Sequence, residues 1–225
     1  MVEERSLGCP CLYVEPCHRM CTCVTPVYSY GCDRCCRYGS LEQQTAMAAY
    51  LAEVIDTKRG LKSVVKIIVA ADPNGVIGIN NTIPWKHKAD MKRFAAITRG
   101  GWLIMGRKTW ESMGCRHLPG RVSLVVSRTP QLNVETHAGL DTAIARAEKS
   151  GAPIWIIGGG ELYRDALARQ FVEEVDFTAI SEAVEVPEGV TPTTFSMEWL
   201  TGFNLVSSTP NVDDPALEHR LYRRV

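Results

Sequence analysis

Four short apolar runs divide the chain from Val64 onward, and they limit the possible fold more than any other feature. The runs are VVKIIVAA (64–71), WLIM (102–105), VSLVVS (122–127) and PIWIIGGG (153–160). Nearly unbroken apolar runs of this length are typical of strands that are buried on both faces. Helical stretches lie between and after them, at 89–98, 109–114, 141–150 and 161–169. This alternation predicts an α/β fold with a mostly parallel sheet, right-handed crossovers and flanking helices.

The C-terminal part of the chain has a different pattern. FTAIS (177–181), FNLVSST (203–209) and HRLYRRV (219–225) alternate more strongly between apolar and polar residues. Such alternation is typical of antiparallel strands with one exposed face. We therefore expect the sheet to end in an antiparallel edge, within one catalytic domain that spans residues 64–225.

The cysteines mark a separate N-terminal module. Eight of the nine lie between Cys9 and Cys36, and the ninth is Cys115. We interpret residues 1–39 as a small cysteine-rich module and residues 40–63 as a helical linker. The linker starts with the S-x-x-Q spacing of a capping box and ends in basic residues before Gly60.

Metal binding is the favoured explanation for this module. About 30 residues cannot bury enough apolar surface to fold unaided, so a cross-link is needed. Short C-x-C and C-x2-C spacings favour structural Zn²⁺, in up to two four-cysteine sites, and His18 could replace one ligand. Disulfides and disorder stay open as alternatives. The expected metal ligands are Cys9, Cys11, Cys17, Cys21, Cys23, Cys32, Cys35 and Cys36.

Charge and hydropathy exclude some classes of partner. Lys+Arg and Asp+Glu both number 25, so no net field attracts nucleic acid or an anionic membrane. No apolar stretch approaches the roughly 20 residues that a membrane helix needs. The N-terminus, MVEERSLGCP, lacks the pattern of a secretory signal. We therefore expect a cytoplasmic protein that acts on a small molecule, with no nucleic acid required.

The first candidate site lies in NGVIGINNTIPWKHKADMKRF (74–94), where a loop rich in glycine and asparagine leads into a helix. Asp90 and Phe94 are four residues apart and therefore share one helical face. A carboxylate beside a phenylalanine and near a buried strand is unusual. Taken alone, however, Asp90 is better explained as a solvated carboxylate favoured by the helix dipole.

The second candidate site is IMGRKTWES (104–112), in which a strand that ends in Gly106 precedes a helix. A helix start presents free N–H groups and the positive end of its dipole to an anion. Arg107 and Lys108 add positive charge where a phosphate would lie. The G-R-K-T sequence alone is a weak signal that a purely structural turn also explains.

The third candidate site is IIGGGELY (156–163), with three glycines between a strand and a helix. Glycine allows positive φ and lets the backbone approach a phosphate closely. The full G-x-G-x-x-G pattern is absent, so the segment does not predict a Rossmann site.

Together the three motifs resemble the dihydrofolate reductase family over residues 65–225. VIG-x4-[LI]-P-W-x4-D-x3-F, present from Val76 to Phe94, is similar to the signature of that family. MGR-x-TWES and IIGGG-x-x-Y are similar to its two NADPH-binding turns, the second of which contains a strained Gly–Gly peptide. The resemblance implies reduction of 7,8-dihydrofolate to 5,6,7,8-tetrahydrofolate by NADPH, in one-carbon and thymidylate metabolism.

The resemblance also implies roles for single residues. Asp90 would accept a fork of hydrogen bonds from the pterin ring. Arg121, in the sequence LPGR, would bind the glutamyl carboxylate of the substrate. Ser127 and Arg128 would flank the 2′-phosphate of NADPH, and Thr178 would hydrogen-bond the pterin-binding carboxylate.

The full set of implied site residues falls into three groups. The catalytic residues are Asp90, Trp85 and Thr178. The substrate-binding residues are Ala70, Asp90, Phe94, Met113, Leu118, Arg121, Ile157 and Thr178. The cofactor-binding residues are Ala71, Ile77, Gly106, Arg107, Lys108, Thr109, Ser127, Arg128, Ile157, Gly158, Gly159, Gly160, Glu161, Leu162 and Tyr163.

Two alternatives to dihydrofolate reduction stay open. One is an NADPH-dependent pyrimidine reductase of the riboflavin-pathway type, which would not be expected to show P-W-x4-D-x3-F. The other is a scaffold built on the N-terminal module, with an inactive reductase domain. Every motif position is occupied by a competent residue, and this favours an enzyme.

Overall fold

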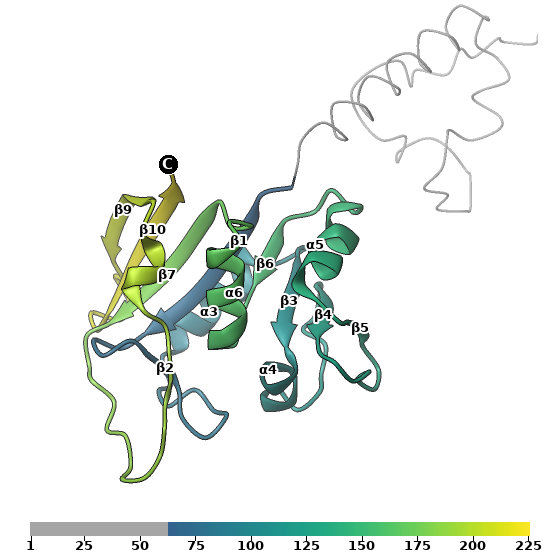
Figure 1. Cartoon of the computed structure of the whole chain (residues 1–225). Coiled ribbons are helices and arrows are strands. Elements are labelled where there is room, and N and C mark those ends of the chain that lie inside the picture. The colour runs from purple at the N-terminus through teal and green to yellow at the C-terminus, as the bar shows by residue number, and fades with distance from the viewer. Residues whose placement is uncertain (1–62) are drawn as a thin grey trace, which may run out of the picture. The chain divides into compact units, whose positions relative to one another are not determined.

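An eight-stranded sheet forms the centre of residues 63–225, the part of the chain that the computed structural model describes (Figure 1). These residues belong to one unit, Leu61–Val225. In spatial order the strands are β5 (Glu135–His137), β4 (Val122–Val126), β3 (Trp102–Gly106), β6 (Ile154–Ile156), β1 (Val65–Ala71), β7 (Glu174–Ile180), β10 (Leu217–Arg224) and β9 (Phe203–Pro210).

The sheet changes from parallel to antiparallel at β7. The strands from β5 to β7 in this order pair in parallel, whereas β10 pairs antiparallel with both β7 and β9. The predicted mostly parallel α/β sheet with an antiparallel C-terminal edge is thus confirmed. The segment FTAIS lies at the boundary, since β7 is parallel to β1 on one side and antiparallel to β10 on the other.

Within residues 63–225, four helices cover the two faces of the sheet. They are α3 (Lys88–Ile97), α4 (Arg107–Ser112), α5 (Leu140–Glu148) and α6 (Gly160–Ala168). Buried residues of α5 and α6 join one core cluster, whereas α3 and α4 contribute to a second cluster through Phe94, Ile97 and Trp110. In the view of Figure 1, α6 accordingly lies in front of the sheet and α3 behind it.

The side chains of β3 show why the apolar runs are unbroken. Ile104 faces the first cluster, while Leu103 and Met105 face the second, and all three are 0% exposed. Successive side chains of a strand point to opposite faces, so a strand between two helical layers needs apolar residues at every position. Burying one such side chain contributes about 1.5–3 kcal/mol.

The short elements were not predicted from the sequence. They are β2 (Val76–Gly78), β8 (Thr193–Thr194), the three-residue β5 and the 3₁₀ helix η1 (Met197–Leu200). β2 and β8 pair with each other outside the main sheet. The predicted linker helix and cysteine-rich module lie outside the described residues.

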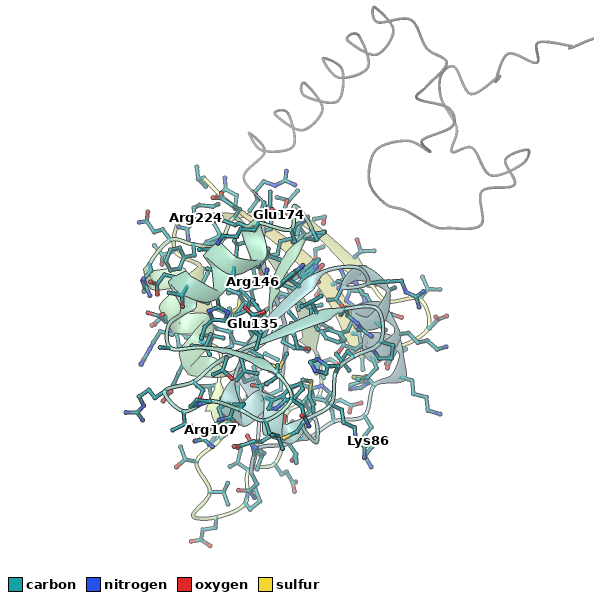
Figure 2. All side chains as sticks on the ribbon, turned by 90° about the vertical axis from the view of Figure 1, so that its right-hand side faces the viewer. Lys86, Arg107, Glu135, Arg146, Glu174 and Arg224 are labelled. Carbon is teal, nitrogen blue, oxygen red and sulfur yellow. The ribbon has the colours of Figure 1, made fainter. Side chains whose placement is uncertain are left out.

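The carboxyl ends of the parallel strands meet at one edge of the sheet, and the connecting loops gather there (Figure 1). Figure 2 shows Lys86 and Arg107 at this end of the molecule and Glu174, at the start of β7, at the opposite end. In open α/β sheets, ligands bind outside the carboxyl ends of the strands. In the described part of the chain, no helix is long and apolar enough to cross a membrane.

Candidate functional site

The helix α3 carries the candidate carboxylate. α3 follows the Ile83-Pro84-Trp85 segment, and Asp90 lies in its first turn, where the helix dipole favours a negative charge. Asp90 and Phe94 are both half-buried, and no residue of α3 is fully buried. The inner face of the helix therefore leaves surface on which a ligand can pack.

Four apolar residues predicted to bind substrate converge on one core cluster. They are partly buried, and they pack against the buried residues Leu103, Met105 and Trp110 among others. The four are Phe94 of α3, Met113 after α4, Leu118 of the next loop and Ile157 after β6. Residues up to 63 positions apart thus line the same face, as a wall for a flat aromatic ligand requires.

Thr178 lies on β7 beside Ala70 of β1 and opposite His219 of β10. The threonine is only 1% exposed, and its hydroxyl lies 3.2 Å from Nδ1 of His219. Among the described residues, no hydrogen bond joins Thr178 to Asp90. The hydrogen-bond partner of the Thr178 hydroxyl is thus a histidine that the sequence did not single out.

The charge of Asp90 acts on Tyr163, which is buried, and on His219, which is half-buried. Burial raises the pKa of Tyr163 well above its ordinary range, and Asp90 raises it further. Burial and then Arg93 lower the pKa of His219, while Asp90 and Asp176 oppose that lowering. The charge of Asp90 is therefore felt by one residue of α6 and one of β10.

Arg121 is held beside the same apolar wall. Its Nη1 donates to Oγ1 of Thr98 at 3.2 Å, and its guanidinium lies 5.8 Å from the centre of the Phe94 ring. Burial and the nearby charge of Arg99 lower the pKa of Arg121 from its ordinary value. An anionic group placed here would relieve the repulsion between the two arginines.

The two glycine turns lie side by side, because β3 and β6 are neighbours in the sheet. The N–H of Gly106 donates to the carbonyl of Gly158 at 2.8 Å. Gly158 has a φ of 129°, and a Cβ on it would lie 3.3 Å from Oγ1 of Thr109. The Gly158–Gly159 peptide bond is cis. The strand–helix turns after β3 and β6 thus form one continuous backbone surface.

Other predicted cofactor residues pack in the core or beside the glycine turns. Ala71 and Leu162 are buried in the core. The Tyr163 hydroxyl donates to the carbonyl of Ile68 at 2.7 Å. Ile77 lies beside Gly160, with its Cδ1 3.9 Å from the position of a Cβ. Glu161 is exposed in the first turn of α6. Its carboxylate would repel a phosphate, so only its backbone N–H suits one.

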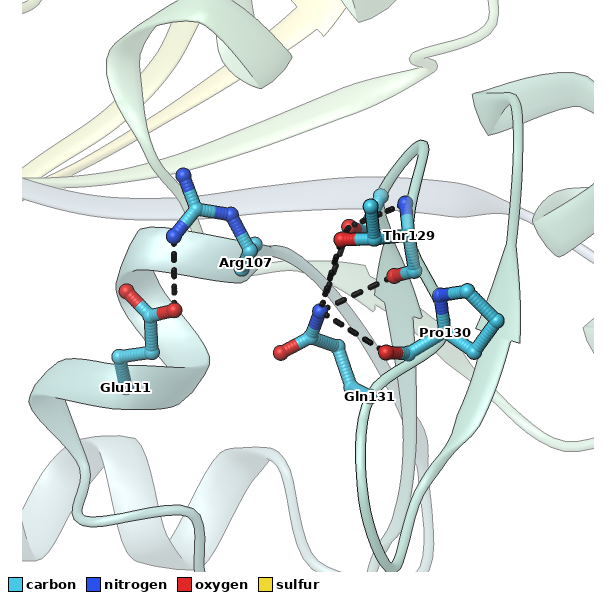
Figure 3. Close-up of polar contacts among 6 residues, drawn as sticks. Arg107, Glu111, Thr129, Pro130 and Gln131 are labelled. Atoms are coloured by element: carbon cyan, nitrogen blue, oxygen red, sulfur yellow. Dashed lines mark hydrogen bonds and ion pairs between the residues drawn. The ribbon is translucent and has the colours of Figure 1, made fainter.

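The basic residues predicted to bind a phosphate are exposed. Arg107 pairs with Glu111 one turn along α4 at 2.7 Å (Figure 3). Lys108 and Arg128 are also exposed. A cavity of about 340 Å³ lies beside Arg128. Its lining residues are Ser127, Arg128, Pro130, Gln131, Val134, Thr136 and Ala138.

The sequence model of the family described as dihydrofolate reductase matches residues 64–215. The chain belongs to the dihydrofolate reductase family. Its similarity covers 61% of the chain and 90% of the dihydrofolate reductase of Mycobacterium leprae, at 36% identity over 149 residues. The bifunctional dihydrofolate reductase-thymidylate synthase of Paramecium tetraurelia is 37% identical over 116 residues, which are 51% of this chain and 25% of that protein.

A solved dihydrofolate reductase has the same fold. The enzyme from Enterococcus faecalis, complexed with NADP(H) and RAB-propyl, superimposes with a TM-score of 0.64 at 26% identity. The match covers 72% of this chain and 97% of the Enterococcus chain. The chain thus spans the length of these single-domain relatives and about a quarter of the bifunctional one.

The loop after β1 is held by a buried carboxylate that was not predicted from the sequence. Asp72 is 4% exposed, and its carboxylate accepts the N–H groups of Asn74, Val76 and Val184 at 2.7–2.9 Å. Asn80 and Asn81 both have positive φ and close a two-residue turn between Ile79 and Thr82. The sequence DPNG and the pair NN were the available signals, because Asp and Asn suit such turns.

Two ion pairs at α3, the helix of Asp90, were also not predicted from the sequence. Arg93 of α3 makes a two-pronged ion pair with Asp176 of β7. His87, just before α3, pairs with Asp214 at 2.8 Å. The signal for Arg93 was its position, three residues after Asp90 and thus near the same face.

Residues 63–225 contain no group of three His, Cys, Asp or Glu side chains that could hold a metal ion. Cys115, within this part, is exposed and free. The eight cysteines predicted to bind zinc lie outside the described residues.

Proposed function

We propose that this protein reduces 7,8-dihydrofolate to 5,6,7,8-tetrahydrofolate with NADPH. The observation that carries the proposal is the placement of Asp90. This carboxylate stands on the same helix as Phe94, and Phe94 packs on the same core cluster as Met113, Leu118 and Ile157. A flat, weakly polar ring with one amidine-like edge matches such a surface, since two parallel hydrogen bonds to a carboxylate are strong and directional.

The paired glycine turns suit a dinucleotide. A side chain on Gly158 would meet Thr109 at 3.3 Å, and one on Gly106 would lie 3.7 Å from the N–H nitrogen of Gly159. Bare backbone therefore fills this surface, and the pyrophosphate would contact it together with the Thr109 hydroxyl. Arg107, Lys108 and Arg128 would hold the 2′-phosphate. When bound, NADPH supplies the hydride that C6 of the pterin accepts.

The side chains of this protein would hold and polarise the substrate. Asp90 would orient the pterin and raise the basicity of N5 electrostatically. No Asp, Glu or His of the motifs is assigned to N5, so water admitted by the loop of residues 76–88 would donate the proton. Trp85 and Phe94 would limit access of other water to the site, and the Gly78–Thr82 segment would act as a lid. Arg121 would bind the glutamyl carboxylate.

Loss of absorbance at 340 nm, on mixing NADPH and dihydrofolate with the protein, tests this function. A pyrimidine reductase would consume NADPH with a ribosylaminopyrimidine but not with dihydrofolate, and an inactive scaffold would consume it with neither. Binding of NADPH in the absence of any turnover would favour the scaffold.

We further propose the division of the chain into a cysteine-rich module (1–39), a helical linker (40–63) and the catalytic domain (64–225), in a cytoplasmic protein. The reason is chemical: eight clustered thiols within 28 residues can complete two tetrahedral zinc sites. Dihydrofolate is the proposed small-molecule partner, and catalysis requires no nucleic acid or membrane.

A further inference from the structure

The turn between β9 and β10 fixes the orientation of Asn211. The N–H groups of Asp213 and Asp214 donate to Oδ1 of this asparagine at 2.9 and 3.0 Å. Backbone N–H groups can only donate, so the atom that they contact must be the amide oxygen. The amide nitrogen, Nδ2, therefore points the other way, and it lies 2.9 Å from Nε2 of His219.

The orientation of Asn211 determines the tautomer of His219. Nδ2 of an asparagine is only a donor, so Nε2 of the histidine must accept and carries no hydrogen. A neutral imidazole has one N–H, which is then on Nδ1. Nδ1 lies 3.2 Å from Oγ1 of Thr178, so it donates to that hydroxyl.

The Thr178 hydroxyl is consequently free to donate its own hydrogen elsewhere. No hydrogen bond joins it to Asp90 in the described part of this structure, but the packing of α3 on β7 brings that carboxylate toward it. Arg93 of α3 pairs with Asp176 of β7, which places these two positions against each other. Asp90 precedes Arg93 by three residues, about 4.5 Å along a helix. Thr178 follows Asp176 by two residues, about 6.6 Å along a strand and on the same face. α3 connects β1 to β3, and these two strands are parallel, so the helix is antiparallel to the strands. The step from Arg93 back to Asp90 and the step from Asp176 on to Thr178 therefore go in the same direction.

We infer that His219 is a positioning residue for the substrate site, which directs the hydroxyl hydrogen of Thr178 toward the carboxylate of Asp90. The inference rests on the proposed function, since Asp90 is there the pterin-binding group. In this relay, the contacts Asn211–His219 and His219–Thr178 have their donors and acceptors assigned, and the step from Thr178 to Asp90 is the inferred one. When the Thr178 hydroxyl donates to Asp90 and accepts from His219, its oxygen keeps one lone pair for an N–H of the ligand.

The surroundings of His219 keep it in the required neutral state. Burial and the facing charge of Arg93 lower its pKa, and the carboxylates of Asp90 on α3 and Asp176 on β7 only partly oppose this. A neutral histidine at pH 7 preserves the acceptor at Nε2. Protonation would set an N–H against the donor of Asn211, and that contact would be lost.

The tautomer is directly measurable on the full-length protein. ¹⁵N NMR of the imidazole groups at pH 7.5 distinguishes the two ring nitrogens, and the chain has only five histidines. The signals of His219 are those that disappear in His219→Asn. The relay predicts a hydrogen on Nδ1 and none on Nε2. A hydrogen on Nε2 would overturn it, whether or not the protein turns over dihydrofolate.

Two near-isosteric variants separate a positioning role from a packing role. In His219→Asn, the amide nitrogen can occupy the place of Nδ1 and still donate to Thr178. In His219→Gln, the amide can occupy the place of Nε2, so it keeps the contact with Asn211 but removes the donor to Thr178. The relay predicts that the Kd for dihydrofolate rises about tenfold in His219→Gln and less than threefold in His219→Asn.

Fluorescence titration of dihydrofolate and NADPH measures both variants. The relay predicts an unchanged Kd for NADPH, and a His219→Gln effect that vanishes when Thr178 is already valine. Equal effects of the two variants, or a larger effect of His219→Asn, would overturn the relay. If the wild-type protein binds no dihydrofolate, the proposed function fails, and the NMR measurement alone decides the tautomer.

Discussion

Arg93 of α3 and Asp176 of β7 form a two-pronged ion pair, with Nη2 donating to Oδ2 at 2.7 Å and Nη1 donating to Oδ1. The side chains are 27% and 12% exposed, so the pair is partly shielded from water. Because each partner satisfies the other, losing one leaves a charge in a poorly solvated place. This pair fixes α3, and with it Asp90, against β7.

The first prediction concerns this pair. Arg93→Met should lower the free energy of unfolding by about 2–4 kcal/mol, because it leaves Asp176 without a partner. The double variant Arg93→Met/Asp176→Leu should recover most of that loss, since two apolar side chains need no counter-charge. Urea denaturation followed by circular dichroism measures all three proteins.

The exposed Arg107–Glu111 pair provides a matched control. Arg107→Met should change the stability by less than about 0.5 kcal/mol, as is usual for an exposed i,i+4 pair. If the double variant is no more stable than Arg93→Met, the cost does not come from an unpaired charge.

The choice of cofactor is the second prediction. Arg128 lines the cavity next to Ser127 and has no ion-pair partner among the described residues, whereas Arg107 is engaged with Glu111. We expect at least a tenfold preference for NADPH over NADH in kcat/KM, because one charged hydrogen bond contributes about 1.5–3 kcal/mol. Arg128→Ala should remove most of the preference, and Arg107→Ala less. Equal kcat/KM values for the two cofactors in the wild type would show that these residues do not hold the 2′-phosphate.

Arg121 gives the third prediction. Its replacement by leucine should raise the KM for dihydrofolate at least tenfold and lower kcat much less, because Arg121 would bind a part of the substrate remote from the reacting atoms. Arg99→Leu is the control, because it removes a nearby positive charge and leaves the contacts of Arg121 with Thr98 and Phe94 in place. A fall confined to kcat would contradict the assigned role.

The strands and helices of the domain were predictable because burial on both faces leaves a clear record in the sequence. Ile104 and Met105 face opposite layers, and each layer requires an apolar residue. The candidate site was predictable for a different reason, since its glycines and Asp90 occur in ordered motifs. β2 and β8, by contrast, are held by pairing with each other, and the N–H of Phe195, just after β8, donates to the carbonyl of Gly75, just before β2. Their short segments have no periodicity of their own.

His219, Arg93 and Asp176 escaped prediction because their roles depend on pairing across the fold. His219 lies 41 positions from Thr178, and the two meet only through the register of β7 and β10. Arg93 and Asp176 are ordinary surface types in a linear reading, and only the packing of α3 on β7 joins them. No local pattern contains that information.

The fourth prediction concerns the cysteines between Cys9 and Cys36. Protein purified without chelator should contain one or two zinc ions per chain. A strong chelator should release them and unfold residues 1–39, while turnover of dihydrofolate by the catalytic domain continues. Metal-free protein with eight freely reactive thiols in this segment would contradict the assignment.

The last prediction tests the central role of Asp90. Asp90→Asn should keep its affinity for NADPH, because Asp90 is not among the residues assigned to the cofactor. Turnover at pH 7 should fall by about 10²–10³, the usual effect of removing an aligned group that stabilises charge in the transition state. Activity should recover in part at acidic pH, where the solvent protonates the substrate. Asp141→Asn, an exposed carboxylate of α5, is the control and should behave as the wild type.

The most direct measurement is the pH dependence of kcat for the wild type and Asp90→Asn, followed at 340 nm with saturating NADPH and dihydrofolate. The predicted result is a variant that is nearly inactive at pH 7 and gains rate steadily toward acidic pH. An Asp90→Asn protein with near wild-type turnover at pH 7 would remove this carboxylate from the reaction and contradict the account.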